Sequence, residues 1–200
     1  MAKRSLDARL ERAGIQPERV QLLNDAPVQS RGFVLYWMQA AQRAQGNHAL
    51  EAAILHANER GQPVVALFAL THAYPGANLR HYAFLLQGLA ETADALAARG
   101  IPLVVDCGEA PDVVERWAAD ASLVVADRGY TRVQRSWRET VAGAVDARLL
   151  QVESDVVVPA EWASTKEEYA ARTLRPRIHK QLDRFLVPLR KQKVKRDGLG

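Results

Sequence analysis

Cysteine and long apolar runs are scarce in this sequence, and both shortages restrict the class of protein. Cys107 is the single cysteine among 200 residues, so no internal disulfide can form and a reducing, cytoplasmic setting is expected. The longest apolar runs, 32–38 and 64–70, have about seven residues, whereas a membrane-spanning helix needs roughly 20. The first residues are charged or polar and lack the apolar core of a secretory signal. We therefore expect no membrane segment.

The motifs of several enzyme classes are also missing. There is no Gly-x-x-x-x-Gly-Lys-Ser/Thr phosphate loop, no Gly-x-Gly-x-x-Gly turn and no Gly-x-Ser-x-Gly nucleophile elbow. The five histidines are scattered along the chain and Cys107 has no second cysteine near it, so the spacing of a metal site is absent. These absences leave no residue with a predicted catalytic or metal-binding role.

The composition itself is that of an ordinary globular domain. Hydrophobic residues make up 48% of the chain and charged residues 25%. A length of 200 residues suits one medium domain with tails. A wholly disordered chain, a collagen-like chain and a coiled-coil rod are excluded.

The net charge of +4 is unevenly spread along the chain. Residues 166–200 hold eleven Lys/Arg and four Asp/Glu, a net charge of +7, which leaves −3 on residues 1–165. A basic end on a slightly acidic body indicates contact with phosphate or with an acidic partner. The alternative is a solvated helix face followed by a frayed basic tail.

From residue 33 onward, strand and helix patterns alternate. Runs rich in β-branched and apolar residues predict buried parallel strands at 33–38, 64–70, 102–105, 122–126 and 148–152. Apolar residues spaced by three and four predict helices at 47–59, 78–99, 111–120 and 132–144. In the helix at 78–99 one apolar face is expected to bury core, formed by Leu79, Tyr82, Ala83, Leu86, Leu89, Ala90, Ala93 and Leu96.

This alternation predicts an α/β fold, a doubly wound five-stranded parallel sheet covered on both faces. Residues 1–30 are predicted to be an N-terminal extension, 31–160 the α/β domain, and 161–200 a basic helical linker and tail. A helix over 166–186, interrupted near Pro176, is expected to be the element least protected from hydrogen exchange. In such folds ligands bind beyond the carboxyl ends of the strands.

The loop after the first of these strands is rich in aromatic and amide side chains. Trp37 and Met38 end the strand, and Gln39 and Arg43 follow it. An aromatic ledge beside fork-shaped donors suits a flat, polar-edged heterocycle. The alternative is that Trp37 and Met38 are core packing and that Arg43 pairs with a surface carboxylate.

A second candidate loop follows the strand at 122–126. Asp127 stands where a doubly wound fold places ligand-contacting residues, and Tyr130 and Arg132 come shortly after it. Asp127 could equally cap the next helix, and Tyr130 and Trp137 could pack that helix on the sheet.

A third cluster is basic. Arg172, Arg175, Arg177 and Lys180 are spaced to lie close together on one surface. Contact with phosphate is one interpretation, and packing against an acidic neighbouring domain is the other.

Taken together, these segments resemble the class II cyclobutane pyrimidine dimer photolyases. The resemblance is carried, in order, by Val-Leu-Tyr-Trp-Met-Gln-Ala-Ala-Gln-Arg at 34–43 with Asn-His-Ala-Leu at 47–50, Asn-Leu-Arg-His-Tyr-Ala-Phe-Leu-Leu-Gln-Gly-Leu at 78–89, Ala-Asp-Arg-Gly-Tyr-Thr-Arg at 126–132 with Trp137, Val-Glu-Ser-Asp-Val-Val-Val-Pro at 152–159, and Glu-Tyr-Ala-Ala-Arg-Thr-Leu-Arg-Pro-Arg-Ile-His at 168–179. It covers about residues 20–188. The match at 168–179 is the most specific of the set.

The resemblance implies the Rossmann-like N-terminal domain of a photolyase, which repairs cyclobutane dimers in DNA with light. The FAD site of the family lies in a C-terminal helical domain, so this chain is expected to lack it and to be inactive alone. The resemblance implies an antenna pigment, an 8-hydroxy-5-deazaflavin or a reduced folate, near Trp37, Met38, Gln39, Arg43 and Asp127, and more weakly Tyr130 and Arg132. The implied partners are the flavin-binding domain and, through the full enzyme, damaged DNA, with Arg172, Arg175, Arg177 and Lys180 at the contact surface.

Two other functions stay open from the sequence. One is a free-standing nucleotide-binding or regulatory α/β module. The other is an interaction protein that binds DNA or protein through its basic end.

Overall fold

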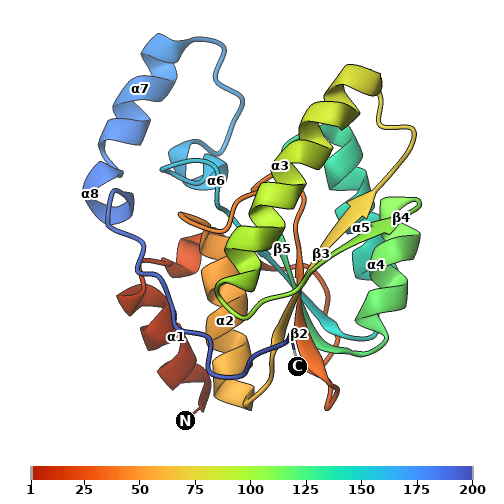
Figure 1. Cartoon of the computed structure of the whole chain (residues 1–200). Coiled ribbons are helices and arrows are strands. Elements are labelled where there is room, and N and C mark those ends of the chain that lie inside the picture. The colour runs from red at the N-terminus through yellow and green to blue at the C-terminus, as the bar shows by residue number, and fades with distance from the viewer. Residues whose placement is uncertain (1, 200) are drawn as a thin grey trace.

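A six-stranded sheet forms the centre of the computed structural model, which describes residues 2–199 (Figure 1). The strand order is β1-β6-β5-β2-β3-β4. The strands are β1 Val20–Leu22, β2 Phe33–Trp37, β3 Val64–Leu70, β4 Leu103–Cys107, β5 Ala121–Asp127 and β6 Arg148–Val152. Strands β2 to β6 pair in parallel, which confirms the predicted α/β fold and its parallel sheet.

The strand count differs from the prediction by one. β1 pairs antiparallel with β6, with Val20 opposite Val152 and Leu22 opposite Leu150. It is only three residues long, and its pairing partner, β6, is more than a hundred positions away in the sequence. No local pattern marks so short an edge strand, so it was assigned to the extension.

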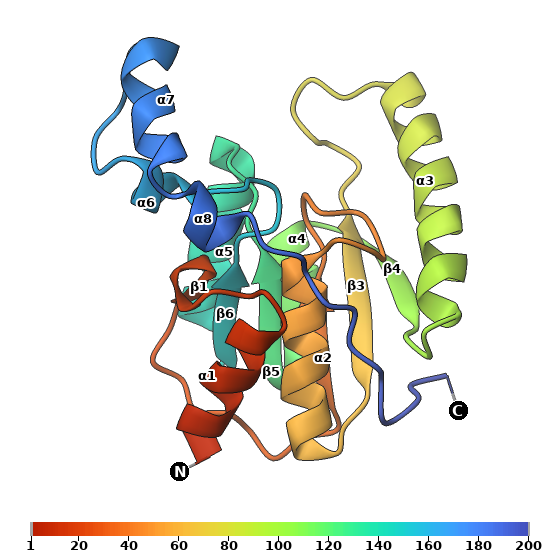
Figure 2. The ribbon, with the colours of Figure 1, turned by 90° about the vertical axis from the view of Figure 1, so that its left-hand side faces the viewer.

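Helices cover both faces of the sheet (Figures 1 and 2). α1 Ala2–Arg12, α2 His48–Arg60 and α3 Leu79–Ala97 share the core cluster of one face, and α4 Ala110–Ala118 and α5 Arg132–Ala144 that of the other. Local sequence determines where α2 begins and ends. Asn47 accepts a hydrogen bond from the amide of Leu50 at the start of α2, and Gly61 ends that helix with φ +65°.

The N-terminal segment packs against the sheet layer instead of extending from it. Leu6, Leu10 and Ile15 are buried in the same cluster as α2. A short 3-10 turn, Pro17–Arg19, then leads into β1. Residues 6–22 therefore belong to the packed layers of the α/β unit.

The expected buried face of α3 is confirmed for only half of its residues. Leu89, Thr92 and Leu96 are the buried residues of the helix, whereas Leu79 of the expected face is 84% exposed. Phe84, which was not expected to be buried, is 80% exposed. Leu86, Ala83 and Ala90 are exposed as well. The reason is position: α3 contacts β4, the last strand of the sheet, so only one narrow side of it meets the core.

Residues 158–185 form a small helical unit at the carboxyl edge of the sheet. It contains α6 Ala160–Ala163, α7 Ala171–His179 and α8 Leu182–Phe185. Phe185 and Val158 are at the centre of its apolar cluster. The predicted helix over 166–186 is thus shorter and divided, with Pro176 inside α7 rather than at its end.

The end of the chain returns along the α/β layers. Residues 188–199, here called the C-terminal strap, run across α2 without regular secondary structure (Figure 2). The amide of Arg190 donates to the carbonyl of Ala13 (2.8 Å), and the amide of Gly198 donates to the carbonyl of Gly100 (3.0 Å). The basic stretch within 190–196 is therefore packed on the domain, which differs from the predicted tail leading away from it.

Candidate ligand site

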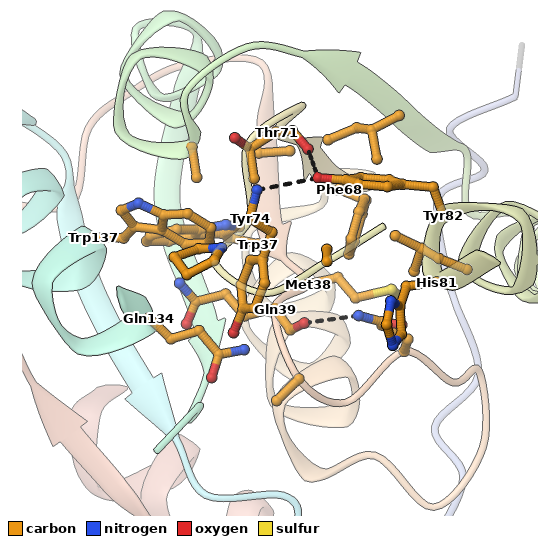
Figure 3. Close-up of a pocket in the computed structure, with 18 of the residues that line it drawn as sticks. Trp37, Met38, Gln39, Phe68, Thr71, Tyr74, His81, Tyr82, Gln134 and Trp137 are labelled. Carbon is orange, nitrogen blue, oxygen red and sulfur yellow. Dashed lines mark hydrogen bonds between the residues drawn. The ribbon is translucent and has the colours of Figure 1, made fainter. Parts of the chain in front are cut away.

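A cavity of about 410 Å³ opens at the carboxyl ends of β2 and β3 (Figure 3). β2 lies between β5 and β3, so the direction in which the sheet grows reverses beside it, and this is where doubly wound folds bind ligands. The wall comes from β2 and the loop after it, residues 38–46 (the cavity loop), from the loop after β3, and from α3 and α5. Its principal side chains are Trp37, Met38, Gln39, Phe68, Thr71, Tyr74, His81, Tyr82, Gln134 and Trp137.

Aromatic rings form one side of this cavity. Tyr74 and Trp137 meet edge to face, with ring centroids 5.9 Å apart and planes at 72°. Figure 3 shows Trp37 beside them. Because aromatic faces attract other flat π-systems, this side of the cavity suits a planar heterocycle.

The opposite side is built by the start of α3. The hydroxyl of Tyr82 donates to the carbonyl of Thr71 (2.7 Å) and accepts from the amide of Tyr74 (3.1 Å), which holds the loop after β3. The imidazole of His81 accepts from the amide of Asn78 (3.1 Å), as part of the capping box of α3. Helix capping therefore places His81 and Tyr82 at the cavity.

Gln39 brings an unpartnered donor to the wall. Its Oε1 accepts from Nη1 of Arg138 (2.8 Å), whose Nη2 donates to the carbonyl of Gly129 (2.7 Å). These bonds orient the amide, and its buried Nε2 has no hydrogen-bond partner among residues 2–199. An unmet buried donor costs about 1–3 kcal/mol. An acceptor on a bound ligand would satisfy it.

Asp127 shapes the cavity loop from beneath. Its Oδ1 accepts from the amide of Gln39 (2.6 Å), and its Oδ2 accepts from the amides of Ala40 (2.6 Å) and Ala41 (2.7 Å). Burial raises the pKa of Asp127, and the three backbone donors oppose that rise. The structure thus uses Asp127 to hold the loop, while Thr131 caps the following helix.

The predicted site residues fall into two groups. Trp37, Met38 and Gln39 line the cavity together. Arg43 points elsewhere, because its Nη1 lies 2.8 Å from Asp155 and its Nη2 donates to the carbonyl of Ser154 (2.7 Å).

Tyr130 and Arg132 also lie off the cavity wall. The hydroxyl of Tyr130 bonds to Glu153, and Arg128 stacks over its ring at 4.9 Å. Burial, followed by the bond to Glu153, raises the pKa of Tyr130. Arg132 is exposed at the first position of α5.

The four basic residues occupy α7 and its end, across the carboxyl edge from α3 (Figures 1 and 2). Arg172, Arg175, Arg177 and Lys180 are all exposed. Arg177 pairs with Glu168 at 3.0 Å. None of the four lines the cavity, and their contact with phosphate or with a neighbouring domain stays a prediction.

Sequence reasoning missed much of the cavity wall. Tyr74, His81 and Gln134 were not singled out, Tyr82 was assigned to the apolar face of a helix, and packing was the alternative given for Trp137. The available signal was the tripeptide Tyr-Pro-Gly at 74–76, an aromatic turn directly after a predicted strand.

Two further findings concern the described residues as a whole. No group of three or more His, Cys, Asp or Glu side chains within 2–199 is arranged to hold a metal ion. No helix in that range is long and apolar enough to cross a membrane.

Comparison with protein families identifies the following match. The family model described as DNA photolyase matches residues 34–195 of this chain. The curated deoxyribodipyrimidine photo-lyase of Methanothermobacter thermautotrophicus is 47% identical over 186 residues, which are 92% of this chain and 42% of that protein. The enzyme of the same name from Potorous tridactylus is 35% identical over 163 residues, 80% of this chain and 30% of that protein. The chain thus spans less than half the length of these relatives.

A solved structure shares the fold. An archaeal photolyase from Sulfolobus tokodaii, described with two FAD molecules and a novel light-harvesting cofactor, superposes with a TM-score of 0.62. The match covers 80% of this chain and 36% of that one at 18% identity. At that identity the likeness concerns the fold alone.

Proposed function

The chain belongs to the DNA photolyase family, and from this premise we propose that its cavity binds the light-harvesting pigment of a class II-type photolyase for cyclobutane pyrimidine dimers. The candidate pigments are an 8-hydroxy-5-deazaflavin and a reduced folate. Both are flat heterocycles that carry carbonyl acceptors on their edges.

The observation that carries this proposal is the combination of ring-lined walls and an unmet donor in one cavity. Its volume of about 410 Å³ lies within the range of small-molecule sites, roughly 300–1,000 Å³. Tyr74 and Trp137 offer ring surfaces on one side, and Gln39 Nε2 offers a buried hydrogen bond. A planar ligand with an edge carbonyl meets both requirements.

The chain's own residues then have distinct roles. Trp137 and Tyr74 would contact the ring system, Gln39 would donate to a carbonyl, and Asp127 would keep the cavity loop in place. When bound, the pigment would absorb light and pass the excitation to a flavin. No residue of this chain is assigned a catalytic role.

Repair of damaged DNA is proposed for a whole protein that also includes the part of the relatives this chain does not span. FAD and the dimer would be bound there. The helical unit at 158–185 offers the docking face for such a flavin-binding domain, since Trp162 is 51% exposed and Tyr169 is 84% exposed on it.

The test is an absorption titration of the purified chain with each pigment. Binding would give a shifted near-ultraviolet or blue band, and Trp137→Ala would weaken it about tenfold through lost ring contact. Gln39→Leu, which keeps the volume and removes the donor, would weaken it to a similar degree. Arg132→Ala is the matched control and should bind as the natural chain does.

Absence of a shifted band with both pigments would reject the antenna function. Equal weakening by Arg132→Ala would show that the spectral change arises outside the cavity. The first result would favour the free-standing module considered from the sequence, and the second would place the pigment at another site.

Contact with DNA through α7 is the second candidate function, and the exposed arginines of that helix favour it. Binding of the chain to duplex DNA would then fall steeply as salt rises. Replacing Arg172 and Arg175 with alanine should lower the slope of log K against log salt by about two. A slope unchanged by these substitutions would place any DNA contact elsewhere.

A further inference from the structure

The C-terminal strap is seated on α2 in a single register. Nδ2 of Asn58 in α2 donates to the carbonyl of Lys193 (2.8 Å), and its Oδ1 accepts from the amide of Lys195 (2.9 Å). Leu189 and Val194 of the strap pack against the core of that face. A one-residue slip of the strap would break both bonds of Asn58 and turn Val194 outward.

Between these contacts the strap meets a buried ion pair. Nη2 of Arg99 lies 2.8 Å from Oε1 of Glu51, and their side chains are only 4% and 2% exposed. The amide of Gln192 donates to Oε2 of Glu51 (2.7 Å), and its carbonyl accepts from Arg99 (3.3 Å). Burial raises the pKa of Glu51, and the Gln192 amide and Arg99 oppose that rise. The strap backbone therefore helps to keep the buried carboxylate ionised.

The same guanidinium also reaches the cavity loop. Nη1 of Arg99 donates to the carbonyl of Ala44, 2.6 Å away. In that loop Gln42 lines the cavity, and its side chain donates to the carbonyl of Gln39 (3.0 Å). Arg99, just after α3, thus connects the strap with α2 and with the cavity loop that directly precedes α2.

We propose that Glu51 and Arg99 are positioning residues through which the seated strap fixes the cavity loop and so sets the shape of the ligand cavity. A guanidinium donates from nitrogens in a rigid plane, so its bonds to the strap side and to Ala44 share one orientation. Weakening the strap contact frees that plane to turn and loosens the loop. Only the statement about a ligand rests on the proposed function; the link between strap and loop does not.

A pair of proline substitutions in the full chain separates this link from general loosening. Gln192→Pro removes the amide that binds Glu51, and Lys195→Pro removes the amide that binds Asn58. Gln192 has no regular secondary structure and Lys195 lies at a bend of the strap, so neither substitution interrupts a helix or a strand. Hydrogen exchange of the ligand-free chain is measured over 38–46 and over β5.

Gln192→Pro is expected to accelerate exchange of the cavity loop roughly tenfold and to leave β5 unchanged. Lys195→Pro is expected to leave the cavity loop at its natural rate. No change in Gln192→Pro, or equal acceleration in both variants, would overturn the proposal. Acceleration of β5 as well would show loss of the whole fold and overturn it too.

Arg99→Lys is a second variant that approaches the link from its centre. Lysine keeps the charge opposite Glu51 but has no fork to reach Ala44 at the same time. The cavity loop should then exchange faster while the Gln192 amide stays protected. Loss of protection at both places, or at neither, would contradict the assigned role of Arg99.

Pigment affinity is the final readout and separates the two proposals. If the cavity binds a pigment, Gln192→Pro should weaken it about threefold to tenfold and Lys195→Pro should not. If neither pigment binds while the exchange pattern appears, the proposed function fails and the link between strap and loop stands. If the pigment binds equally to both variants, the link does not control the cavity.

Discussion

α2 and α3 are both apolar helices on the same face of the sheet, yet they are buried to very different extents. α2 buries nine of its residues, including Glu51 and His56, whereas α3, although longer, buries three. α2 lies over the central strands β2 and β5 and is covered by α1. α3 contacts the edge strand β4. The place of a helix along the sheet, more than its apolar content, decides how much of it is buried.

The largest expected effect is on core packing. Ile54→Ala in α2 leaves a cavity at a fully buried position and should lower the free energy of unfolding by about 2–5 kcal/mol. Phe84→Ala in α3 removes a larger side chain that is mostly exposed. This substitution should change the free energy of unfolding by less than about 0.5 kcal/mol. Urea denaturation of both variants checks this. Similar losses in the two would mean that the exposed side of α3 is covered in solution.

The N-cap residues of α2 and α3 should show the same contrast in stability, with the larger loss in α2. Asn47 is buried, caps Leu50 and donates to the hydroxyl of Tyr36 (2.7 Å) and the carbonyl of Ala41 (3.0 Å). Replacing Asn47 with alanine should lower the free energy of unfolding by about 3 kcal/mol. The helix loses its cap, and the buried groups that Asn47 bonds are left without a partner. Asn78→Ala at the exposed cap of α3 should cost about 1 kcal/mol. Thermal unfolding compares them, and equal costs would contradict the burial argument.

α2 should also make stability depend on pH. Burial lowers the pKa of His56 to about 3 and that of His48 to about 4. As pH falls, these histidines take up a proton in the unfolded chain before they do so in the folded chain. The stability they contribute is therefore fully present above about pH 6.5, the ordinary pKa of histidine, and is lost as pH falls toward the folded pKa values. The loss is up to about 1.4 kcal/mol per pH unit for each histidine.

Replacing His56 with asparagine tests this dependence. The slope of unfolding free energy between pH 6.5 and 4 should become shallower, with His48 supplying the remainder. The variant and the natural chain should have parallel curves above pH 7. An unchanged slope below pH 6.5 would show that His56 is solvated.

The smallest expected effect is a gain in α3. Gly88 is exposed in the helix interior, and a Cβ built there meets nothing within 4 Å. Gly88→Ala should therefore raise stability by roughly 0.5–1 kcal/mol through the lower flexibility of the unfolded chain. Gly14→Ala is the opposite case, because its φ is +88° and a Cβ would lie 2.5 Å from the carbonyl oxygen of Pro188. A loss of stability in Gly88→Ala would indicate that this side of α3 contacts another group in solution.

The sequence was sufficient for the parallel sheet and most helices because those patterns are local. The strand at Val64–Leu70 is an apolar, β-branched run, and Asn47 and Gly61 mark the ends of α2 by their own conformational preferences. The exposed side of α3 was not predictable, since its apolar spacing says nothing of which strand it will cover. β1 was missed because its pairing depends on residues more than a hundred positions away.

The candidate site was predictable in place but not in composition. Trp37 and Gln39 follow from the rule that ligands sit at strand ends. The role of Asp127 did not follow, because only the register of β5 beside β2 brings its carboxylate under the amides of 39–41. The strap was interpreted as a basic tail because the inward positions of Gln192 and Val194 are hidden in a run of positive charge.

The hydrogen bond between Arg190 and Ala13 joins the first and last segments of the chain, and this sets an order for assembly. During synthesis α1, α2 and every strand leave the ribosome before the strap does. The strap lies outside these elements, so no segment has to thread beneath it. Closing the long loop between residues 13 and 190 is slow compared with forming a local helix. The order of the chain and the outer position of the strap therefore allow the sheet, α1 and α2 to pack before the strap is seated.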